Sequence, residues 1–250
     1  MYELYNIDKA NKNFEENKLF KKLLKIVQHK STNDLIELET IKKGMFLVEE
    51  NQYVTGFYFI LEGRIKVFNS GVNNKKQILK LATKGDIIGL SGFNSLYYWA
   101  SAFAEEDVKA YFITPKNLEI LLVLFPDFTL LLVKEFAFKV RSYEIRQKHL
   151  GLFPATERII DSLLLIASKF GSKTSNGILI EHCTSRKDIS SFASVSEANT
   201  IRTLRKFQDK GYITIEKKII IINERETLAN LLKIHCCPTD EKEKKGCYID

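Results

Sequence analysis

The chain has 250 residues, of which 45% are hydrophobic and 28% charged, with a formal net charge of +7 and a pI near 9.0. This length allows one large domain or two ordinary ones with packed cores, and the mixture of charges excludes a disordered basic tail. The basic excess favours a polyanionic partner. Residues 1–17 are polar, and charge and proline interrupt the apolar-rich stretch 118–133. We therefore expect no signal peptide, no membrane span and a cytoplasmic location.

A helix followed by a run of short strands is predicted in the first half of the chain. Residues 13–29 carry apolar side chains at helical spacing. After them come eight short strands with glycines at their joints: 35–41, 45–48, 57–61, 64–69, 77–82, 86–88, 99–104 and 108–114. Strands of this length and spacing predict an antiparallel jelly-roll barrel, also called a double-stranded β-helix.

Barrels of this kind sometimes hold a catalytic metal on histidines. The positions of the histidines therefore indicate whether such a catalytic metal site could form. The four in this chain are His29, His149, His182 and His235, and none lies in a predicted strand. No serine or cysteine has an evident histidine partner, and no phosphate-binding glycine loop precedes a lysine. The sequence therefore predicts a protein that is not an enzyme.

A short helix from Pro115 to Phe125 and a longer one from Pro126 to about Leu150 are predicted next. The longer helix has two apolar lines. One consists of Leu131, Phe138 and Ile145, and the other of Leu132, Phe136, Val140 and Tyr143. The basic residues Lys134, Lys139, Arg141 and Arg146 are expected to lie in solvent. One apolar side is expected to cover the barrel and the other to meet the same helix of a second subunit. The alternative is a helix packed only within its own monomer.

Gly151 and Pro154 are expected to end this helix and to separate two domains. Residues 154–171 then predict an amphipathic helix, 171–177 a turn and 178–180 a short strand.

Two helices and a hairpin are predicted between residues 184 and 222. Ser185 with Asp188 forms a capping box, Ser196 caps a second helix over 197–210, and Gly211 ends that helix. Two β-branched runs, 212–215 and 219–222, flank the charged turn that contains Lys217. This order predicts a winged helix-turn-helix, and a further helix is expected over 226–235.

Charge in this segment supports DNA binding. Residues 184–213 contain six basic and three acidic side chains, a net of +3. In the second helix Ala198, Leu204 and Phe207 are expected to face inward. The candidate DNA-binding residues are Ser185, Arg186, Ser196, Glu197, Ala198, Asn199, Arg202, Arg205, Lys206 and Lys217. The alternative is that the basic helix is only a solvated face.

The order of these elements resembles the CRP/FNR family, the cyclic-AMP receptor protein and its relatives, over about residues 35–223. The resemblance is carried by Gly44, residues 58–63 and 85–89, Pro126, Pro154 with Arg158, and the helix-turn-helix. It implies an α+β homodimeric transcription regulator that binds a near-palindromic double-stranded DNA site and contacts RNA polymerase. The expected domains are a cyclic-nucleotide-binding-like effector domain (1–125), a dimerisation helix (126–152), the winged helix-turn-helix (153–225) and a helix with a cysteine-containing tail (226–250).

The segment after Gly89 departs from the relatives that bind cyclic nucleotides. Those relatives carry a glutamate for the ribose, and an arginine followed by a small hydroxyl residue for the phosphate. Here Leu90 stands in the glutamate position, and Tyr98, Trp99 and Ala100 stand about where the arginine and hydroxyl fall. No arginine occurs between residues 64 and 141, so a cyclic phosphate would lack its two-pronged partner. We therefore expect that cyclic AMP does not bind tightly.

Aromatic residues dominate the candidate effector pocket instead. It consists of Gly89, Leu90, Phe93, Tyr97, Tyr98, Trp99, Ala100 and Tyr143, the last from the long-helix position at which relatives contact the base. Phe103 is a further aromatic residue near it. Two interpretations stay open: these side chains simply fill the barrel, or they bind an unknown apolar or aromatic effector, such as haem.

The second helix of the helix-turn-helix also departs from the resemblance. Relatives read bases with a glutamate two residues after the capping serine and an arginine four residues further on. Here Glu197 comes one residue early, Ala198 stands in the glutamate position, and Arg202 keeps the arginine position. Arg202 is expected to contact guanine, Ala198 a thymine methyl, and Asn199 adenine or a phosphate. The DNA half-site should therefore differ from the family's usual one.

Cysteines are confined to the end of the chain, at Cys183, Cys236, Cys237 and Cys247. They exclude a disulfide framework and an N-terminal iron-sulfur cluster. The last three are weak metal candidates, because a cluster needs a fourth ligand and adjacent cysteines fit one cube poorly. Unligated thiols are the alternative. A redox or iron-sulfur regulator, and a ligand-binding protein without DNA binding, remain alternative functions.

Overall fold

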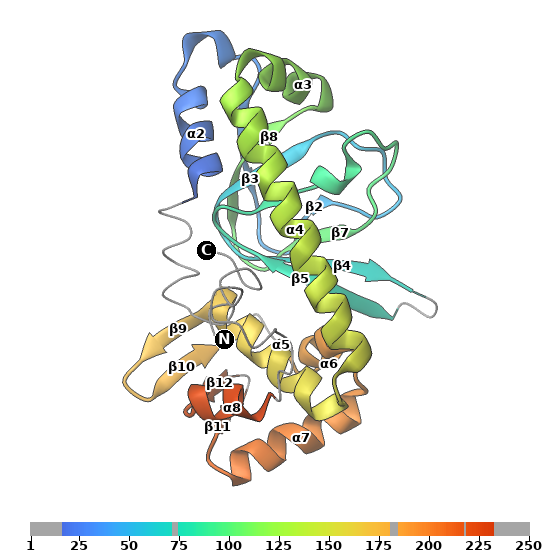
Figure 1. The fold of residues 1–250 in the computed structure, drawn as a ribbon, viewed down its shortest axis with the longest axis vertical. Coiled ribbons are helices and arrows are strands. Elements are labelled where there is room, and N and C mark those ends of the chain that lie inside the picture. Colours follow the sequence, from blue (N-terminus) through green and yellow to red (C-terminus); the bar gives the residue numbers. More distant parts are fainter. Residues whose placement is uncertain (1–16, 72–74, 181–184, 218, 233–250) are drawn as a thin grey trace, which may run out of the picture. The chain divides into compact units, whose positions relative to one another are not determined.

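The computed structural model describes residues 17–71, 75–180, 185–217 and 219–232. The chain divides into two compact units, one spanning Phe14–Gln147 and one within Lys148–Asp250 (Figure 1). The first is a β-roll with helices and the second a winged helix-turn-helix, which confirms the predicted α+β fold. Within the described ranges, no helix combines the length and the apolar composition that crossing a membrane requires.

The roll consists of two antiparallel four-stranded sheets. Their orders are β1-β8-β3-β6 and β2-β7-β4-β5. All eight predicted strands are present, with ends displaced by at most two residues: β1 Glu37–Ile41, β2 Phe46–Val48, β3 Phe57–Glu62, β4 Ile65–Ser70, β5 Lys76–Ala82, β6 Ile87–Ile88, β7 Ser101–Ala104 and β8 Val108–Ile113. Except for β4 and β5, which are consecutive, the paired strands are distant in sequence. Side chains alternate along each strand, so every second one points into the roll.

Large and small side chains share the interior of the roll. Tyr58 and Tyr98 belong to the same buried cluster as Ala102, Ala104 and Ala110. Small inward residues leave room for the tyrosine rings, which is how a narrow barrel reaches the packing density of a protein core. The interior is therefore filled by the chain's own side chains.

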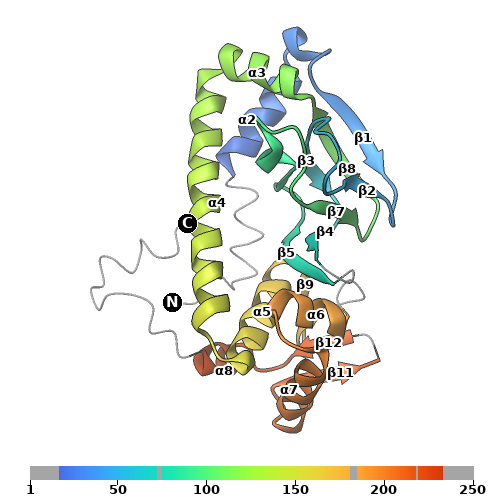
Figure 2. The same cartoon turned by 90° about the vertical axis from the view of Figure 1, so that its right-hand side faces the viewer.

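Helices cover one side of the roll (Figure 2). These are α2 Lys18–Val27, the short 3₁₀ turns η2 Lys30–Thr32 and η4 Leu90–Gly92, α3 Pro115–Leu124, and α4 Pro126–Leu152. Leu23 of α2, Leu118 of α3 and Phe128 of α4 are fully buried in one cluster with strand residues Phe57 and Phe59. This packing fixes the first half of α4 against the roll.

The helix α4 runs through Gly151 and ends at Leu152, two residues before Pro154, since a single glycine costs a helix only about 1 kcal/mol. One sequence prediction about α4 is wrong. Lys139 does not lie in solvent, because its side chain is 19% exposed and faces the roll. The expected solvent face was drawn from charge alone, and a lysine stem packs well on an apolar surface.

The second unit is built around α5 Ala155–Phe170, which packs against α6, α7 and α8. The other elements are β9 Gly171–Thr174, β10 Gly177–Ile180, α6 Arg186–Ala193, α7 Glu197–Asp209, β11 Ile213–Glu216, β12 Ile219–Ile222 and α8 Arg225–Leu231. Its sheet has the order β11-β12-β10-β9. The predicted turn over 171–177 thus contains a strand, because residues 171–174 pair with 177–180 of β10.

Candidate nucleic-acid interface and effector region

A reciprocal capping box begins α6, as predicted. The Ser185 Oγ accepts a hydrogen bond from the backbone N–H of Asp188 at 3.1 Å, and the Asp188 carboxylate accepts one from the Ser185 N–H at 2.8 Å. Two N–H groups that would lack helical partners are thereby satisfied. The start of α6, with exposed Ser185 and Arg186, is therefore sharply defined.

The turn between α6 and α7 is fixed by contacts at both ends. Ser194 has φ +51°, and its carbonyl accepts a hydrogen bond of 3.0 Å from Arg158 Nη1 of α5. Ser196 caps α7, its Oγ accepting from the Asn199 N–H at 3.3 Å. Sequence reasoning singled out Arg158 without a structural role. In the structure Arg158 of α5 hydrogen-bonds to this turn and so helps to fix the direction in which α7 leaves it.

One side of α7 is buried and the other is open to solvent. Its buried residues are Thr200, Thr203, Leu204 and Phe207. Ala198, Arg202, Arg205 and Lys206 are exposed and lie at helical spacing, so they share one face. The prediction that Ala198 faces inward is wrong. Thr200 lies on the buried face instead, and its Oγ1 donates to the Ser196 carbonyl at 3.1 Å, which satisfies the hydroxyl there.

The wing adds an exposed lysine to this unit. Lys217 lies in the turn between β11 and β12, with φ +54°. Glu197, which opens α7, is also exposed, and Asn199 is half-buried. Arginine at the exposed face of such a helix can contact a guanine edge with two parallel hydrogen bonds, whereas the lysines suit phosphates.

The predicted effector residues differ widely in their exposure to solvent. Leu90 and Tyr98 are buried in the core, Gly89, Phe93 and Ala100 are half-buried, and Tyr97, Trp99 and Tyr143 are 43%, 67% and 50% exposed. Tyr98 N–H bonds to Gln52 O, and Tyr97 pairs with Tyr53. Side chains alternate along such an extended segment, so Tyr98 points inward and its two neighbours outward. These residues thus lie at different depths, and their role in binding an effector stays a prediction. Phe103, also half-buried, contacts Phe46.

Tyr98 is anchored inside the roll by its hydroxyl. The hydroxyl donates to the Gly56 carbonyl at 2.7 Å and accepts from the backbone N–H groups of Gly56 and Thr55 at 3.0 and 3.1 Å. Buried tyrosine hydroxyls need such partners. Two backbone donors that point into the roll are therefore occupied by the chain itself.

An exposed apolar stripe runs along α4. Leu130, Val133 and Val140 are 56%, 57% and 55% exposed, and Ala137 between them is exposed as well. Their spacing of three, four and three residues is that of a coiled-coil seam. The stripe differs from the lines predicted from sequence, since Leu132 is buried against the roll whereas Val140 and Tyr143 are exposed.

Comparison with protein families identifies both units. Residues 38–123 match the model of the cyclic nucleotide-binding domain, and residues 157–231 match the Crp-like helix-turn-helix domain. The two models occur here in the order expected from the resemblance. The chain belongs to the CRP/FNR family of transcription regulators.

Relatives in the CRP/FNR family cover most of the chain. The anaerobic regulatory protein of Bacillus subtilis is 25% identical over 219 residues, 84% of this chain and 92% of the relative. A CRP-like cAMP-activated global transcriptional regulator of Mycobacterium tuberculosis is 22% identical over 188 residues, 75% of this chain and 84% of the relative. The structure of FixK2 from Bradyrhizobium japonicum superposes with a TM-score of 0.70 at 19% identity, covering 81% of this chain and all of FixK2, which shows a shared fold. This chain is thus a CRP/FNR-type regulator with a helix-turn-helix DNA-binding domain.

The cysteines of this CRP/FNR member were the metal candidates in the sequence. Cys183, Cys236, Cys237 and Cys247 lie outside the described residues. In the part of the chain that the structure describes, no three His, Cys, Asp or Glu side chains converge as metal ligands.

Proposed function

We propose that the chain acts as a homodimer that binds a near-palindromic double-stranded DNA site through two copies of α7, under a signal other than cyclic AMP. The observation that carries the DNA-binding proposal is the exposed face of α7. It presents Arg202, Arg205 and Lys206 beside the small side chain of Ala198. Membership of the CRP/FNR family supports RNA polymerase as a further partner.

The apolar stripe of α4 supports the homodimer. Three large aliphatic side chains, Leu130, Val133 and Val140, are each more than half exposed. Burying each of them against a second copy contributes roughly 1.5–3 kcal/mol. A second α4 is the partner whose own stripe matches this spacing. Dimeric helix-turn-helix proteins read half-sites about 34 Å apart on DNA.

Tyr98 and Leu90 support a signal other than cyclic AMP. Leu90 stands in the position of the ribose-binding glutamate and is 5% exposed. Tyr98 occupies the backbone donors of Thr55 and Gly56. A cyclic phosphate placed near these residues would have to displace a buried phenol without gaining an arginine, which opposes binding. Isothermal titration calorimetry is expected to detect no affinity for cyclic AMP at the micromolar level or better.

Genome-wide binding followed by motif discovery tests the DNA-binding function. We expect a near-palindromic motif with half-sites one helical turn apart. Fluorescence anisotropy with that motif should give an affinity that falls steeply as salt rises from 50 to 200 mM, as phosphate contacts require. Absence of a motif, together with equal binding to a scrambled duplex, would refute sequence-specific regulation.

A further inference from the structure

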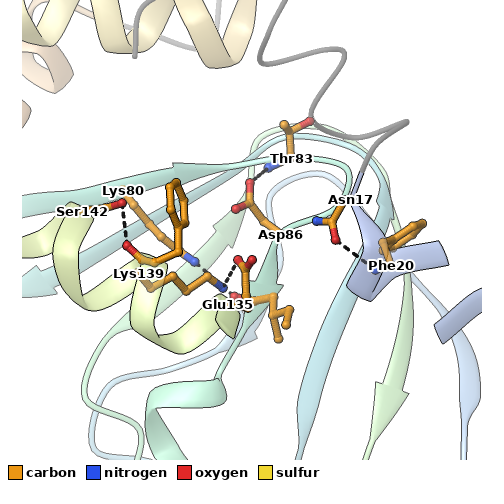
Figure 3. A network of polar contacts seen from close by, with 10 residues as sticks. Asn17, Phe20, Lys80, Thr83, Asp86, Glu135, Lys139 and Ser142 are labelled. Atoms are coloured by element: carbon orange, nitrogen blue, oxygen red, sulfur yellow. Dashed lines mark hydrogen bonds and ion pairs between the residues drawn. The ribbon is translucent and has the colours of Figure 1, made fainter. Parts of the chain in front are cut away.

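Lys139 belongs to a cluster of charged side chains between α4 and the roll (Figure 3). Its amine lies 3.5 Å from the Glu135 carboxylate, and these side chains are only 19% and 22% exposed. In Figure 3 Lys80 extends from β5 toward the same place, and Asp86 lies beside it. The cluster thus gathers two lysines and two carboxylates from three parts of the first unit.

The partners of Lys139 are held in place independently of it. Lys80 Nζ donates to the Ile87 carbonyl at 3.1 Å, and the Asp86 carboxylate accepts from the Thr83 N–H at 3.0 Å. The Lys139 amine has the long contact to Glu135 as its ion pair. The Lys80 ammonium is therefore held near the Lys139 amine. The contact of that amine with Glu135 is weak, because ion pairs weaken with distance.

Both burial and charge favour the neutral form of this amine. Burial is the largest cause and the Lys80 ammonium the second, and together they lower the pKa of Lys139 to about 8. Glu135, Asp86 and Tyr143 act in the opposite direction. At pH 8 about half of Lys139 is then free amine, against less than about 1% of an ordinary lysine.

We propose that Lys139 is a covalent modification site, at which its amine condenses reversibly with small aldehydes to form an imine. Desolvation beside a second cation is the arrangement that activates lysine as a nucleophile. The amine nitrogen forms a bond to the carbonyl carbon, and the carbonyl oxygen leaves as water. Both amine hydrogens end in that water. Glu135 accepts each proton as the nitrogen loses it and passes it to the oxygen, first to form the hydroxyl and then to release it, which leaves a neutral imine. No oxidant or reductant is consumed.

Charge in the cluster selects the aldehyde over carbon dioxide, the other small electrophile that reacts with neutral amines. A neutral imine adds no charge to a cluster in which burial and the Lys80 ammonium disfavour a cation at this nitrogen. A carbamate would instead place a new anion beside the carboxylates of Glu135 and Asp86, which like-charge repulsion opposes. This inference does not depend on DNA binding.

Borohydride trapping with acetaldehyde tests the proposal on the full-length protein. After equilibration at pH 8, the imine is reduced and the ethylated lysines are quantified by peptide mass spectrometry. The matched control is Lys134, an exposed lysine of the same helix. We expect at least tenfold higher occupancy at Lys139 than at Lys134. Equal or lower occupancy at Lys139 would overturn the proposal.

A second variant separates reactivity from mere accessibility. Lys80→Met removes the neighbouring cation, so labelling of Lys139 at pH 7.5 should fall several-fold while that of Lys134 stays unchanged. Occupancy at Lys139 should also level off above about pH 8.5, whereas that of Lys134 keeps rising toward pH 10. The proposal is contradicted if the Lys80→Met variant labels Lys139 as strongly as the natural chain does, and if labelling of Lys139 and of Lys134 rises in parallel with pH. Circular dichroism confirms that the variant is folded.

Discussion

His149 Nδ1 lies 3.0 Å from a carboxylate oxygen of Asp161, and both side chains are almost completely buried. His149 comes from the end of α4 and Asp161 from α5. The imidazole also stacks on Phe153, with ring centroids 4.4 Å apart. Its other nitrogen, Nε2, is buried without a hydrogen-bond partner among the described residues. This contact joins the end of α4 to α5 inside the second unit.

Removing one member of this pair should destabilise the protein strongly. His149→Leu leaves the Asp161 carboxylate buried without its imidazole partner, and we expect a loss of about 3–5 kcal/mol in the free energy of unfolding. The double variant His149→Leu with Asp161→Leu should recover most of the loss, because no buried charge remains. Urea unfolding measures both. As a control, Lys42→Met removes an exposed ion pair with Asp107 and should change little. A double variant less stable than the single one would argue against this account.

Arg202 should govern sequence specificity. Its exposed place on α7 suits a two-pronged contact with guanine, so Arg202→Ala should cost about 1–3 kcal/mol of specific binding. Anisotropy titrations compare the genomic motif with a scrambled duplex. The control is Lys206→Ala, which should weaken binding to both duplexes alike if Lys206 contacts phosphate. Unchanged discrimination in Arg202→Ala would refute its role.

The elements of the fold were predictable from local signals. Ser185 with Asp188 and the cap at Ser196 marked both helices of the helix-turn-helix, since capping depends on neighbouring residues only. The directions of individual side chains depend on tertiary packing and were predicted less well. Ala198 is exposed because it lies off the face of α7 that Thr200, Leu204 and Phe207 bury, and Trp99 is exposed because its neighbour Tyr98 points into the roll.

Contacts between elements distant in sequence carry no local signal. Lys139 and Lys80 are 59 residues apart, and only the packing of α4 on the roll brings them to one cluster. The buried pair of His149 and Asp161 joins two consecutive helices, but it too depends on how those helices pack. Helical periodicity alone also misplaced the exposed stripe of α4, because it does not say which side the roll covers.

The stripe of α4 should control the oligomeric state. Val133→Glu places a charge at the centre of the proposed seam in both subunits, and burying it there is strongly unfavourable. We expect the dissociation constant of the dimer to rise at least a hundredfold, measured by sedimentation velocity at micromolar concentration. Lys134→Glu, one residue off the stripe, is the matched control and should remain dimeric. A dimeric Val133→Glu variant would place the interface elsewhere.

Lys139 should make stability depend on pH in the alkaline range. Because its folded pKa of about 8 lies below the unfolded value, the folded state loses the proton first as pH rises. The penalty for burying the cation, about 3 kcal/mol at most, is full below pH 8 and disappears by about pH 10.5.

Lys139→Met should therefore be more stable than the natural chain at pH 7, and the difference should shrink steadily from pH 8 to 9.5 in urea unfolding. Lys80, Glu135 and Asp86 face the same cluster and stay unchanged in both proteins, and the pKa of Tyr143 is raised by burial, so its titration lies above this window. Lys134→Met controls for loss of a surface lysine and should show no such trend. A stability difference that stays constant from pH 7 to 9.5 would mean that Lys139 does not titrate there.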